Sequence, residues 1–543
     1  MQRTLIRNGR VTVTALRALL ALLVVASVAT PALGRAQPVA AAAPCADSVT
    51  SNYTVHTCFV TPADASTVTG VITVHVTTQV TVGTIKVKRT VFSLDTGYLL
   101  NDFATQFVSN GVSNWHFDLP TAMWVDGVHT LSVTPLLGNN KTKGTPASVD
   151  VTLQNGVTTP PTNTNTFTPT AGRTPQPGAP FIVAAVGDGA AGSAAADRVV
   201  SLIQSWNPNL FLYLADVYER GTYTEFFNWY APSWGQLYSI TDPTVGNHEV
   251  ETPNGDGYAR YWGLNGVQNG PLYYSFDTQG WHFISLDGNP FKNFPQHDDQ
   301  MTWLQNDLTQ HADQCIVAYW HQPLFDEGPA GGSSQVQGLW NQLVAANATL
   351  VLNGHDHSYQ RWEPLDASGT PDATGITEII VGTGGHEVQK IHNDDPRVVK
   401  AVSGAAAAGA LSLTLTPAAL SFAFTKISAA APADSGTIAC RAPPAVTAVS
   451  PAGGSAGGLG RVVISGSHLS TGGPVQGTTY VSFGTTQVAQ LGCPAQPASP
   501  CFTVDSDTQI TAYAPPGTGA VDVTVTTPNG TSAAAAADQY TYS

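Results

Sequence analysis

Hydrophobic and polar residues alternate along residues 45–154 in short runs, separated by clusters of turn-forming residues. Residues 71–78, 84–92 and 129–134 place apolar side chains at every second position, the period of a half-buried β-strand. Several such strands joined by turns are typical of a β-sandwich. We therefore expect residues 45–154 to form an all-β domain.

The pattern changes after this region. Residues 155–179 are rich in Thr and Pro and almost lack large apolar side chains, which predicts an extended, solvated linker. In residues 180–442, apolar runs predict buried strands at 181–186, 210–214, 316–319, 349–352 and 379–381, and periodic apolar positions predict helices at 193–206, 222–230, 300–310 and 335–346. Strands that alternate with helices are typical of an α/β domain.

Residues 443–543 return to short β-strands. The segments 446–454, 460–469, 481–484, 510–516 and 521–532 resemble, in this order, the IPT/TIG immunoglobulin-like domain. Residues 45–154 resemble the immunoglobulin-like modules of secreted bacterial enzymes through the segments 61–68 and 125–131. The predicted fold class is multidomain: a central α/β domain flanked by two all-β immunoglobulin-like sandwiches.

The charge balance limits the partners of the chain. Its 543 residues include 22 Lys and Arg against 37 Asp and Glu, a formal net charge of −15. A protein that binds nucleic acid by releasing phosphate counterions needs the opposite sign, so we expect no nucleic-acid surface. A small anionic substrate is compatible with this charge if metal ions supply local positive charge.

Residues 1–36 have the three regions of a secretory signal peptide. Four arginines precede the apolar run 18–29, and small residues follow it. We expect a mature chain that starts between Ala36 and Ala43 and is secreted, extracellular or attached to the cell surface. An uncleaved membrane anchor is the alternative, but the apolar run is shorter than the roughly 20 residues that a span needs. We expect no membrane span after signal removal.

The six cysteines favour disulfides, because their number is even and the chain is expected to be exported. Six cysteines allow 15 pairings. Closeness in sequence and one pair per domain favour Cys45 with Cys58, Cys493 with Cys501, and Cys315 with Cys440.

Metal-ligating residue types follow the apolar strands of the central domain. Asp188 and Asp216 follow two of them, and Asn247 and His248 lie in the tetrapeptide 246–249. Later strands are followed by His321, His355 and His357. Because strand ends meet at one edge of an α/β sheet, these side chains are expected to converge. Carboxylate, amide and imidazole ligands without thiolates favour a pair of borderline metal ions over structural zinc.

In this order the motifs at 186–189, 214–218, 246–249, 320–323 and 354–357 resemble those of the calcineurin-like metallophosphoesterases, and in particular their secreted, purple-acid-phosphatase-like branch. The resemblance implies a central α/β/β/α sandwich of two β-sheets. It implies that Asp188 and His357 bind a first metal, that Asp216 bridges, and that Asn247, His321 and His355 bind a second. It makes His248 the catalytic residue beside the metals.

The chain departs from the family at the first metal. Many relatives place a His at the position of Ala190, and purple acid phosphatases instead place a Tyr at the position of Glu219. The sequence leaves open whether Tyr218 or Glu219 supplies the missing ligand. It also leaves open whether His386, in a Gly-rich turn, contacts substrate or is structural.

The resemblance implies a secreted dinuclear-metal phosphoesterase that hydrolyses phosphate esters by metal-activated hydroxide attack. We expect an acid-phosphatase-like phosphomonoesterase with two metal ions, drawn from Fe, Zn and Mn, and a small phosphorylated substrate. A phosphodiesterase or nucleotidase with the same site is the first alternative. The second is a non-catalytic cell-surface adhesion or binding protein, because the β modules suit association with a surface or cell wall.

Overall fold

The computed structural model describes residues 44–543 except 103–106, 110, 139–140, 160–166, 264–271, 290–296, 388, 393, 405–406, 471–479 and 490–491. The expected signal peptide lies outside the described residues. Among the residues described, no helix combines the length and the apolar character that crossing a membrane requires.

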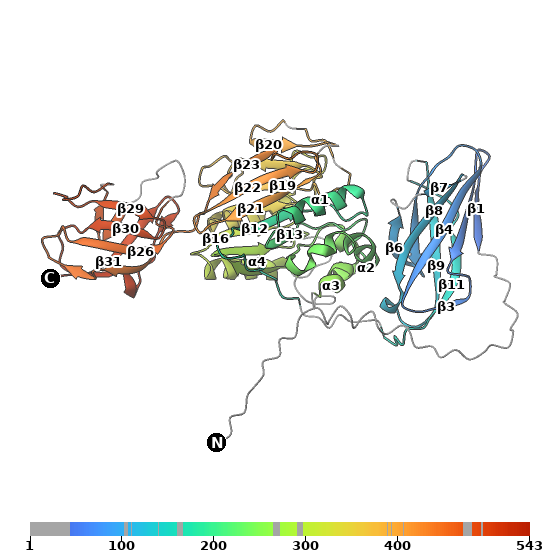
Figure 1. Ribbon diagram of the computed structural model, residues 1–543, viewed down its shortest axis with the longest axis horizontal. Coiled ribbons are helices and arrows are strands. Elements are labelled where there is room, and N and C mark those ends of the chain that lie inside the picture. The colour runs from blue at the N-terminus through green and yellow to red at the C-terminus, as the bar shows by residue number, and fades with distance from the viewer. Residues whose placement is uncertain are drawn as a thin grey trace, which may run out of the picture. The chain divides into compact units, whose positions relative to one another are not determined.

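Residues 45–153, the N-terminal β module, form two packed sheets (Figure 1). The first has the order β1-β2-β4-β8-β7 and the second the order β3-β11-β9-β5-β6, with β10 paired to β9. Inward-facing residues alternate with outward-facing ones, and Phe92, Trp115 and Phe117 lie in the shared core. The strands are β1 (Cys45–Val49), β2 (Thr54–Thr61), β3 (Ser66–Val68), β4 (Val71–Val82), β5 (Val87–Leu94), β6 (Gly97–Asp102), β7 (Phe107–Ser109), β8 (Val112–Pro120), β9 (Gly127–Leu137), β10 (Thr142–Lys143) and β11 (Ala147–Leu153).

The central domain contains a five-stranded and a seven-stranded sheet that share one core. The smaller sheet has the order β13-β12-β21-β22-β23 and the larger one the order β14-β15-β16-β17-β19-β18-β20. The strands of the smaller sheet are β12 (Phe181–Val186), β13 (Leu210–Tyr213), β21 (Gly409–Leu415), β22 (Ala419–Lys426) and β23 (Asp434–Ala439). Those of the larger sheet are β14 (Tyr274–Thr278), β15 (Trp281–Ser285), β16 (Cys315–Tyr319), β17 (Leu350–Asn353), β18 (Tyr359–Trp362), β19 (Thr377–Val381) and β20 (Val398–Val402).

Helices cover the outer faces of both sheets. Val199 and Ile203 of α1 (Ala194–Ser205) pack with the smaller sheet, and Ser193 caps this helix by accepting from the Ala196 amide. Helices α4 (His297–Gln310) and α5 (Gln337–Ala345) pack on the outer face of the larger sheet in a second core. Shorter helices are α2 (Tyr223–Glu225), η3 (Phe226–Tyr230), η4 (Trp234–Ile240), η5 (Glu249–Glu251), η6 (Pro253–Gly255), α3 (Asp256–Trp262) and η7 (Ser334–Val336). The α/β/β/α sandwich expected from the sequence is therefore confirmed.

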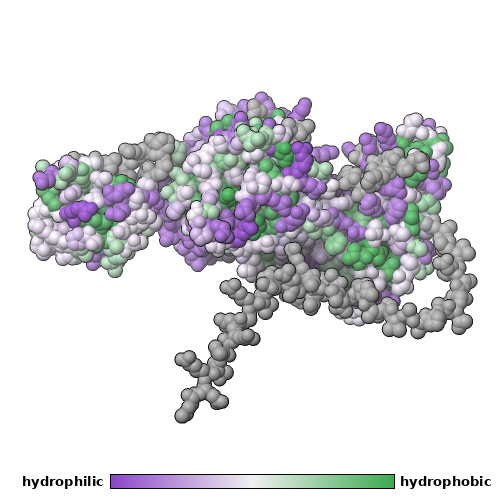
Figure 2. All heavy atoms as spheres, in the orientation of Figure 1, coloured by the Kyte–Doolittle hydropathy of each residue, from purple (hydrophilic) through white to green (hydrophobic). Residues whose placement is uncertain are grey.

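Residues 445–542, the C-terminal β module, again form two sheets. Their orders are β24-β26-β30-β29 and β25-β33-β31-β27-β28, and Ile464, Phe483 and Tyr540 lie between them. The strands are β24 (Ala445–Ser450), β25 (Gly453–Gly454), β26 (Arg461–Ser467), β27 (Tyr480–Phe483), β28 (Thr486–Val488), β29 (Phe502–Ser506), β30 (Gln509–Tyr513), β31 (Gly519–Thr527), β32 (Gly530–Thr531) and β33 (Gln539–Tyr542). On the face of the molecule seen in Figure 2, hydrophobic residues lie scattered among hydrophilic ones.

Part of the expected linker, residues 167–172, docks on the central domain, while most of residues 173–179 are exposed. The Phe167 ring packs on Tyr274 with ring centroids 4.8 Å apart, and the Phe167 amide donates to the Gly263 carbonyl. The Thr170 and Ala171 amides both donate to the buried carboxylate of Asp242. Composition did not predict this docking, because it depends on one aromatic residue and on a carboxylate that lies 72 residues away from Thr170.

The three disulfides expected from the sequence are present: Cys45–Cys58, Cys315–Cys440 and Cys493–Cys501. Cys315 begins β16 of the larger sheet, and Cys440 follows β23 at the edge of the smaller one. This disulfide therefore joins the two sheets of the central domain and closes a loop with a sequence separation of 125 residues.

Replacing Cys315 and Cys440 by Ser should lower the free energy of unfolding of the central domain by about 2–5 kcal/mol, because the unfolded chain gains the entropy of a long open loop. Tryptophan fluorescence during thermal unfolding measures this, since residues 443–543 contain no Trp. The control is the pair Cys493→Ser and Cys501→Ser, which should leave that transition in place. Equal transitions in the two variants would contradict the prediction.

Candidate metal centre

The first ligand candidates lie in tight turns directly after the parallel strands β12 and β13. Asp188 and Asp216 have positive φ angles of 62° and 66°, a left-handed conformation that Asp adopts more readily than most residues. The Asp188 amide donates to the Ala215 carbonyl at 2.9 Å, which ties the two turns together. Both carboxylates are consequently buried at the same edge of the sheet, with 0% and 2% exposure.

One cluster of polar atoms gathers around Asp188. The Tyr218 hydroxyl donates to Asp188 Oδ1 at 2.8 Å and lies 2.9 Å from His357 Nε2. His357 Nε2 is itself 3.5 Å from Asp188 Oδ1. The Glu219 side chain points elsewhere and forms an ion pair with Arg89. Of the two residues that the sequence left open, the geometry therefore brings Tyr218 to this cluster.

A second cluster gathers around Asp216. One ligand atom each from Asp216, His321 and His355 lies within 4.8 Å of the other two. His321 Nε2 is 3.0 Å from Asp216 Oδ2. Asn247 Oδ1 is buried and forms no hydrogen bond with any residue that the structure describes. Such orphaned atoms are rare in folded proteins and fit a ligand that is not part of the chain.

The imidazoles are oriented by backbone carbonyl groups. His321 Nδ1 lies 2.8 Å from the Leu214 carbonyl oxygen, and His357 Nδ1 contacts the Glu387 carbonyl. A ring that donates through Nδ1–H keeps its Nε2 lone pair free. This support of a ring by its second nitrogen is common among metal-ligating histidines.

His248 lies at the side of the Asp216 cluster. Its amide donates to Asp216 Oδ1 at 3.2 Å, and its Nε2 is 3.7 Å from Asp216 Oδ2. Its Nδ1 lies 2.5 Å from the carbonyl oxygen of Glu219. Since the His248 side chain is 26% exposed, its Nε2 can reach a substrate that enters from solvent.

The electrostatics of the Asp216 cluster favour a bound cation. Burial alone would raise the pKa of the Asp216 carboxyl, but His321 and His248 outweigh it and hold that pKa well below its usual range. Burial alone would lower the pKa of His321, but Asp216 and then Asp188 raise it to about 10. Burial and then His321 lower the pKa of His355 to about 4, so this ring keeps a free lone pair. A cation would take the place of the proton that Asp216 and His321 share.

Glu249 supports the site, a role that was not predicted from the sequence. Its buried carboxylate accepts hydrogen bonds from the amides of Val217 at 2.6 Å, Gly246 at 2.7 Å and Asp216 at 3.3 Å. It therefore holds the turn after β13 against the turn that carries Asn247. Its place next to His248 in the tetrapeptide 246–249 was the available signal.

His386 covers the Asp188 cluster from one side. Its ring stacks on Tyr218 with centroids 3.8 Å apart, and its amide donates to the Asp188 carbonyl. The Gly-rich turn 382–387 thus has a structural role at the site, because it holds the tyrosine ring against Asp188.

The residues present fit a pair of metal ions. Their donor set is two carboxylates, one amide oxygen, three imidazoles and one phenol, which suits borderline cations. The backbone also approaches the site closely: a Cβ at Gly354 would lie 2.6 Å from Asp188 Oδ2. Ala190, where many relatives have a His, offers no side-chain ligand. Its carbonyl group accepts a hydrogen bond from the Tyr218 amide, which places it next to Tyr218.

Comparison with known proteins identifies two segments of the chain. Residues 182–359 match the calcineurin-like phosphoesterase family model, and residues 444–542 match the IPT/TIG domain. The chain therefore carries a calcineurin-like phosphoesterase domain and an IPT/TIG domain, as the sequence motifs predicted. The immunoglobulin-like class of the N-terminal β module stays a prediction.

The curated relatives include purple acid phosphatases of a plant and two uncharacterized proteins of Mycobacterium tuberculosis. Purple acid phosphatase 21 of Arabidopsis thaliana is 30% identical over 158 residues, which are 26% of this chain and 36% of that protein. Purple acid phosphatase 22 of the same plant is 27% identical over 211 residues, 34% of this chain and 46% of that protein. The chain thus spans between a third and a half of the length of these relatives. The class that the comparisons support is a metal-dependent phosphoester hydrolase.

Among solved structures, the purple acid phosphatase PPD1 from yellow lupin (Lupinus luteus) seeds is similar over 71% of this chain and 79% of its own, with 13% identity and a TM-score of 0.39.

Replacing Gly354 by Ala should weaken metal binding by at least about tenfold, because the new Cβ would lie 2.6 Å from Asp188 Oδ2 and 3.1 Å from His321 Nδ1. Titration calorimetry and elemental analysis of the purified protein measure this. The control is Gly338→Ala in α5, where the nearest atom is the flexible Met301 Cε at 3.2 Å. Unchanged affinity in the Gly354 variant would place the metals elsewhere.

Proposed function

We propose that this protein hydrolyses phosphate esters at a dinuclear metal centre in its central domain. One observation carries the proposal: Asp188, Asp216, His321, His355 and His357 converge, and the buried Asn247 Oδ1 has no hydrogen-bond partner among the described residues. The family match over residues 182–359 supports the same chemistry.

In this proposal the ligands divide into two groups around Asp216. Asp188, His357 and Tyr218 would hold the first ion, Asn247, His321 and His355 would hold the second, and the Asp216 carboxylate would be shared by the two groups. The chemistry that such a pair supplies is neutralisation of the phosphoryl oxygens and acidification of a water. Fe, Zn and Mn all suit these ligands.

His248 supplies the proton in this mechanism. The Glu219 carbonyl accepts from Nδ1–H and directs Nε2 toward the Asp216 cluster. Asp216 and the Glu219 carbonyl raise the pKa of His248, although burial, the largest single effect, opposes them. In this proposal His248 Nε2–H donates a hydrogen bond to the phosphoryl group and transfers its proton to the leaving oxygen. No covalent intermediate is required.

The finer features of the function follow from the same proposal. We propose a phosphomonoester as the substrate and an extracellular or cell-surface location, with the β modules as spacers or surface contacts. The three disulfides support an oxidising location. A phosphodiester or nucleotide substrate is the alternative at the same site.

Replacing His248 by Ala should lower kcat for a chromogenic aryl phosphomonoester by about 10²-fold or more and leave the metal content intact. Replacing Asp216 by Asn should remove both metals and turnover together. Steady-state kinetics with elemental analysis measures both, and a parallel assay with the matching aryl phosphodiester identifies the substrate class. Normal turnover in the His248 variant would refute its role.

Tyr218 should give the ferric protein a visible absorption band. Burial and then Asp188 hold the pKa of its phenol far above the usual range, so the phenol ionises only beside a strong cation. Tyr218→Phe should abolish the band, and Glu219→Gln should keep it, since Glu219 pairs with Arg89. A spectrum of the iron-loaded protein tests this, and a band that depends on Glu219 would reverse the assignment.

A further inference from the structure

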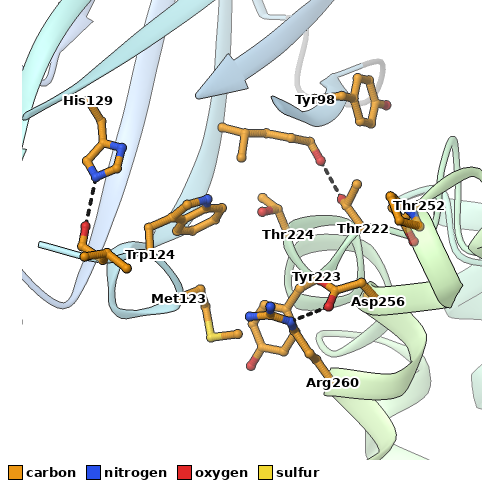
Figure 3. Close-up of a pocket in the computed structure, with 14 residues that line it drawn as sticks. Tyr98, Met123, Trp124, His129, Thr222, Tyr223, Thr224, Thr252, Asp256 and Arg260 are labelled. Atoms are coloured by element: carbon orange, nitrogen blue, oxygen red, sulfur yellow. Dashed lines mark hydrogen bonds and ion pairs between the residues drawn. The ribbon is translucent and has the colours of Figure 1, made fainter. Parts of the chain in front are cut away.

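The N-terminal β module contacts the loop 219–225 of the central domain through strand β6. The Tyr98 hydroxyl donates to Glu225 Oε1 at 2.7 Å, and Thr222 Oγ1 donates to the Leu99 carbonyl at 2.5 Å. The dashed line at Thr222 in Figure 3 marks the second of these bonds. We call this pair of hydrogen bonds the β6 contact.

Glu225 is the centre of the loop. Its carboxylate is buried and, besides Tyr98, accepts hydrogen bonds from the amides of Glu219 at 2.6 Å, Arg220 at 3.0 Å and Thr222 at 3.0 Å. A buried carboxylate is tolerated only when hydrogen bonds replace its water shell. Each of these donors therefore helps to fix the conformation of the loop, and Tyr98 is the donor that comes from another module.

The loop leads directly to the proposed proton donor. The Glu219 amide is bound to Glu225, and the Glu219 carbonyl accepts from His248 Nδ1. A chain of hydrogen bonds thus runs from Tyr98 through Glu225 and the Glu219 peptide groups to His248. A shift of the Glu219 carbonyl changes the direction of His248 Nε2.

We propose that Tyr98 is a positioning residue for His248, so that the N-terminal β module takes part in the hydrolytic reaction without contacting the substrate. This inference rests on the proposed function of His248. It assigns the module a role in catalysis in addition to that of a spacer.

The rest of the module's contact with the central domain does not depend on Tyr98. The Asn228 side chain exchanges two hydrogen bonds of 2.8 Å with the backbone of Asp118, and Trp229 packs in the core cluster of the module. A cavity of about 610 Å³ is lined by residues of both parts, among them Tyr98, Trp124 and Thr222 (Figure 3). Removing one hydroxyl therefore loosens the loop while the module stays in place.

The test is the variant Tyr98→Phe in the full-length, metal-loaded protein. The ring remains and keeps its contact with the Arg220 guanidinium, 4.5 Å above it. We expect kcat to fall about 3- to 10-fold for aryl phosphates with poor leaving groups, the scale of one lost hydrogen bond of ordinary strength. For strongly activated leaving groups, which need no proton, kcat should stay close to that of the unmodified protein, and KM and metal content should not change.

Two controls separate positioning from general destabilisation. Tyr238→Phe makes the same chemical change at an exposed tyrosine of the central domain and should leave all rates unchanged. In the background of His248→Ala, Tyr98→Phe should cause no further loss, because Tyr98 acts through that imidazole. An equal loss for all leaving groups, a loss in the His248 variant, or no loss at all would overturn the proposal.

Amide hydrogen exchange gives a second readout that needs no turnover. In Tyr98→Phe the amides of residues 219–225 should exchange at least about threefold faster. Unchanged exchange would show that Tyr98 does not hold the loop, whatever the values of kcat and KM. If the unmodified protein shows no turnover, the proposed function fails, and the exchange rates alone still decide whether Tyr98 holds the loop.

Discussion

The burial of two carboxylates at one strand edge is the constraint on which the site depends. Asp188 and Asp216 are almost inaccessible to water, and an uncompensated buried charge costs several kcal/mol. The surrounding loops supply the compensation: the His355 amide donates to Asp188, the His248 amide donates to Asp216, and His321 lies 3.0 Å from Asp216. The turns therefore adopt conformations in which their amides and His321 contact these carboxylates. The same conformations bring the proposed metal ligands together.

Two further buried carboxylates, outside the proposed metal ligands, also accept hydrogen bonds from backbone amides. Glu249 collects amides from the turns that carry Asp216 and Asn247, and Glu225 collects amides from the loop 219–225. Each carboxylate thus fixes the backbone conformation of the loops whose amides it binds. The site is accordingly held by buried acids in loops, and the regular elements mainly provide the edge at which these loops begin.

The sequence predicted the parts that depend on strand ends. Apolar runs located β12, β13, β16 and β17. The Asp residues follow parallel strands of the smaller sheet and the His residues follow parallel strands of the larger one, and the two groups converge because the two sheets pack on one core. The choice between Tyr218 and Glu219 could not be predicted, since it depends on the direction of one side chain after a left-handed turn at Asp216. Glu225 forms a capping box with Thr222, three residues before it, and its contact with Tyr98 spans 127 positions. Local sequence patterns do not predict hydrogen bonds between residues so far apart in the chain.

The docked segment at Phe167 limits how far the N-terminal β module can move away. Residues 154–166 separate the end of β11 from this docking point, and a fully extended chain of that length reaches roughly 45 Å. The module is thus tethered, and its association with the central domain is an intramolecular event at an effective concentration in the millimolar range. Contacts too weak to join two separate proteins can then remain formed, which explains how a few hydrogen bonds suffice to couple the two parts.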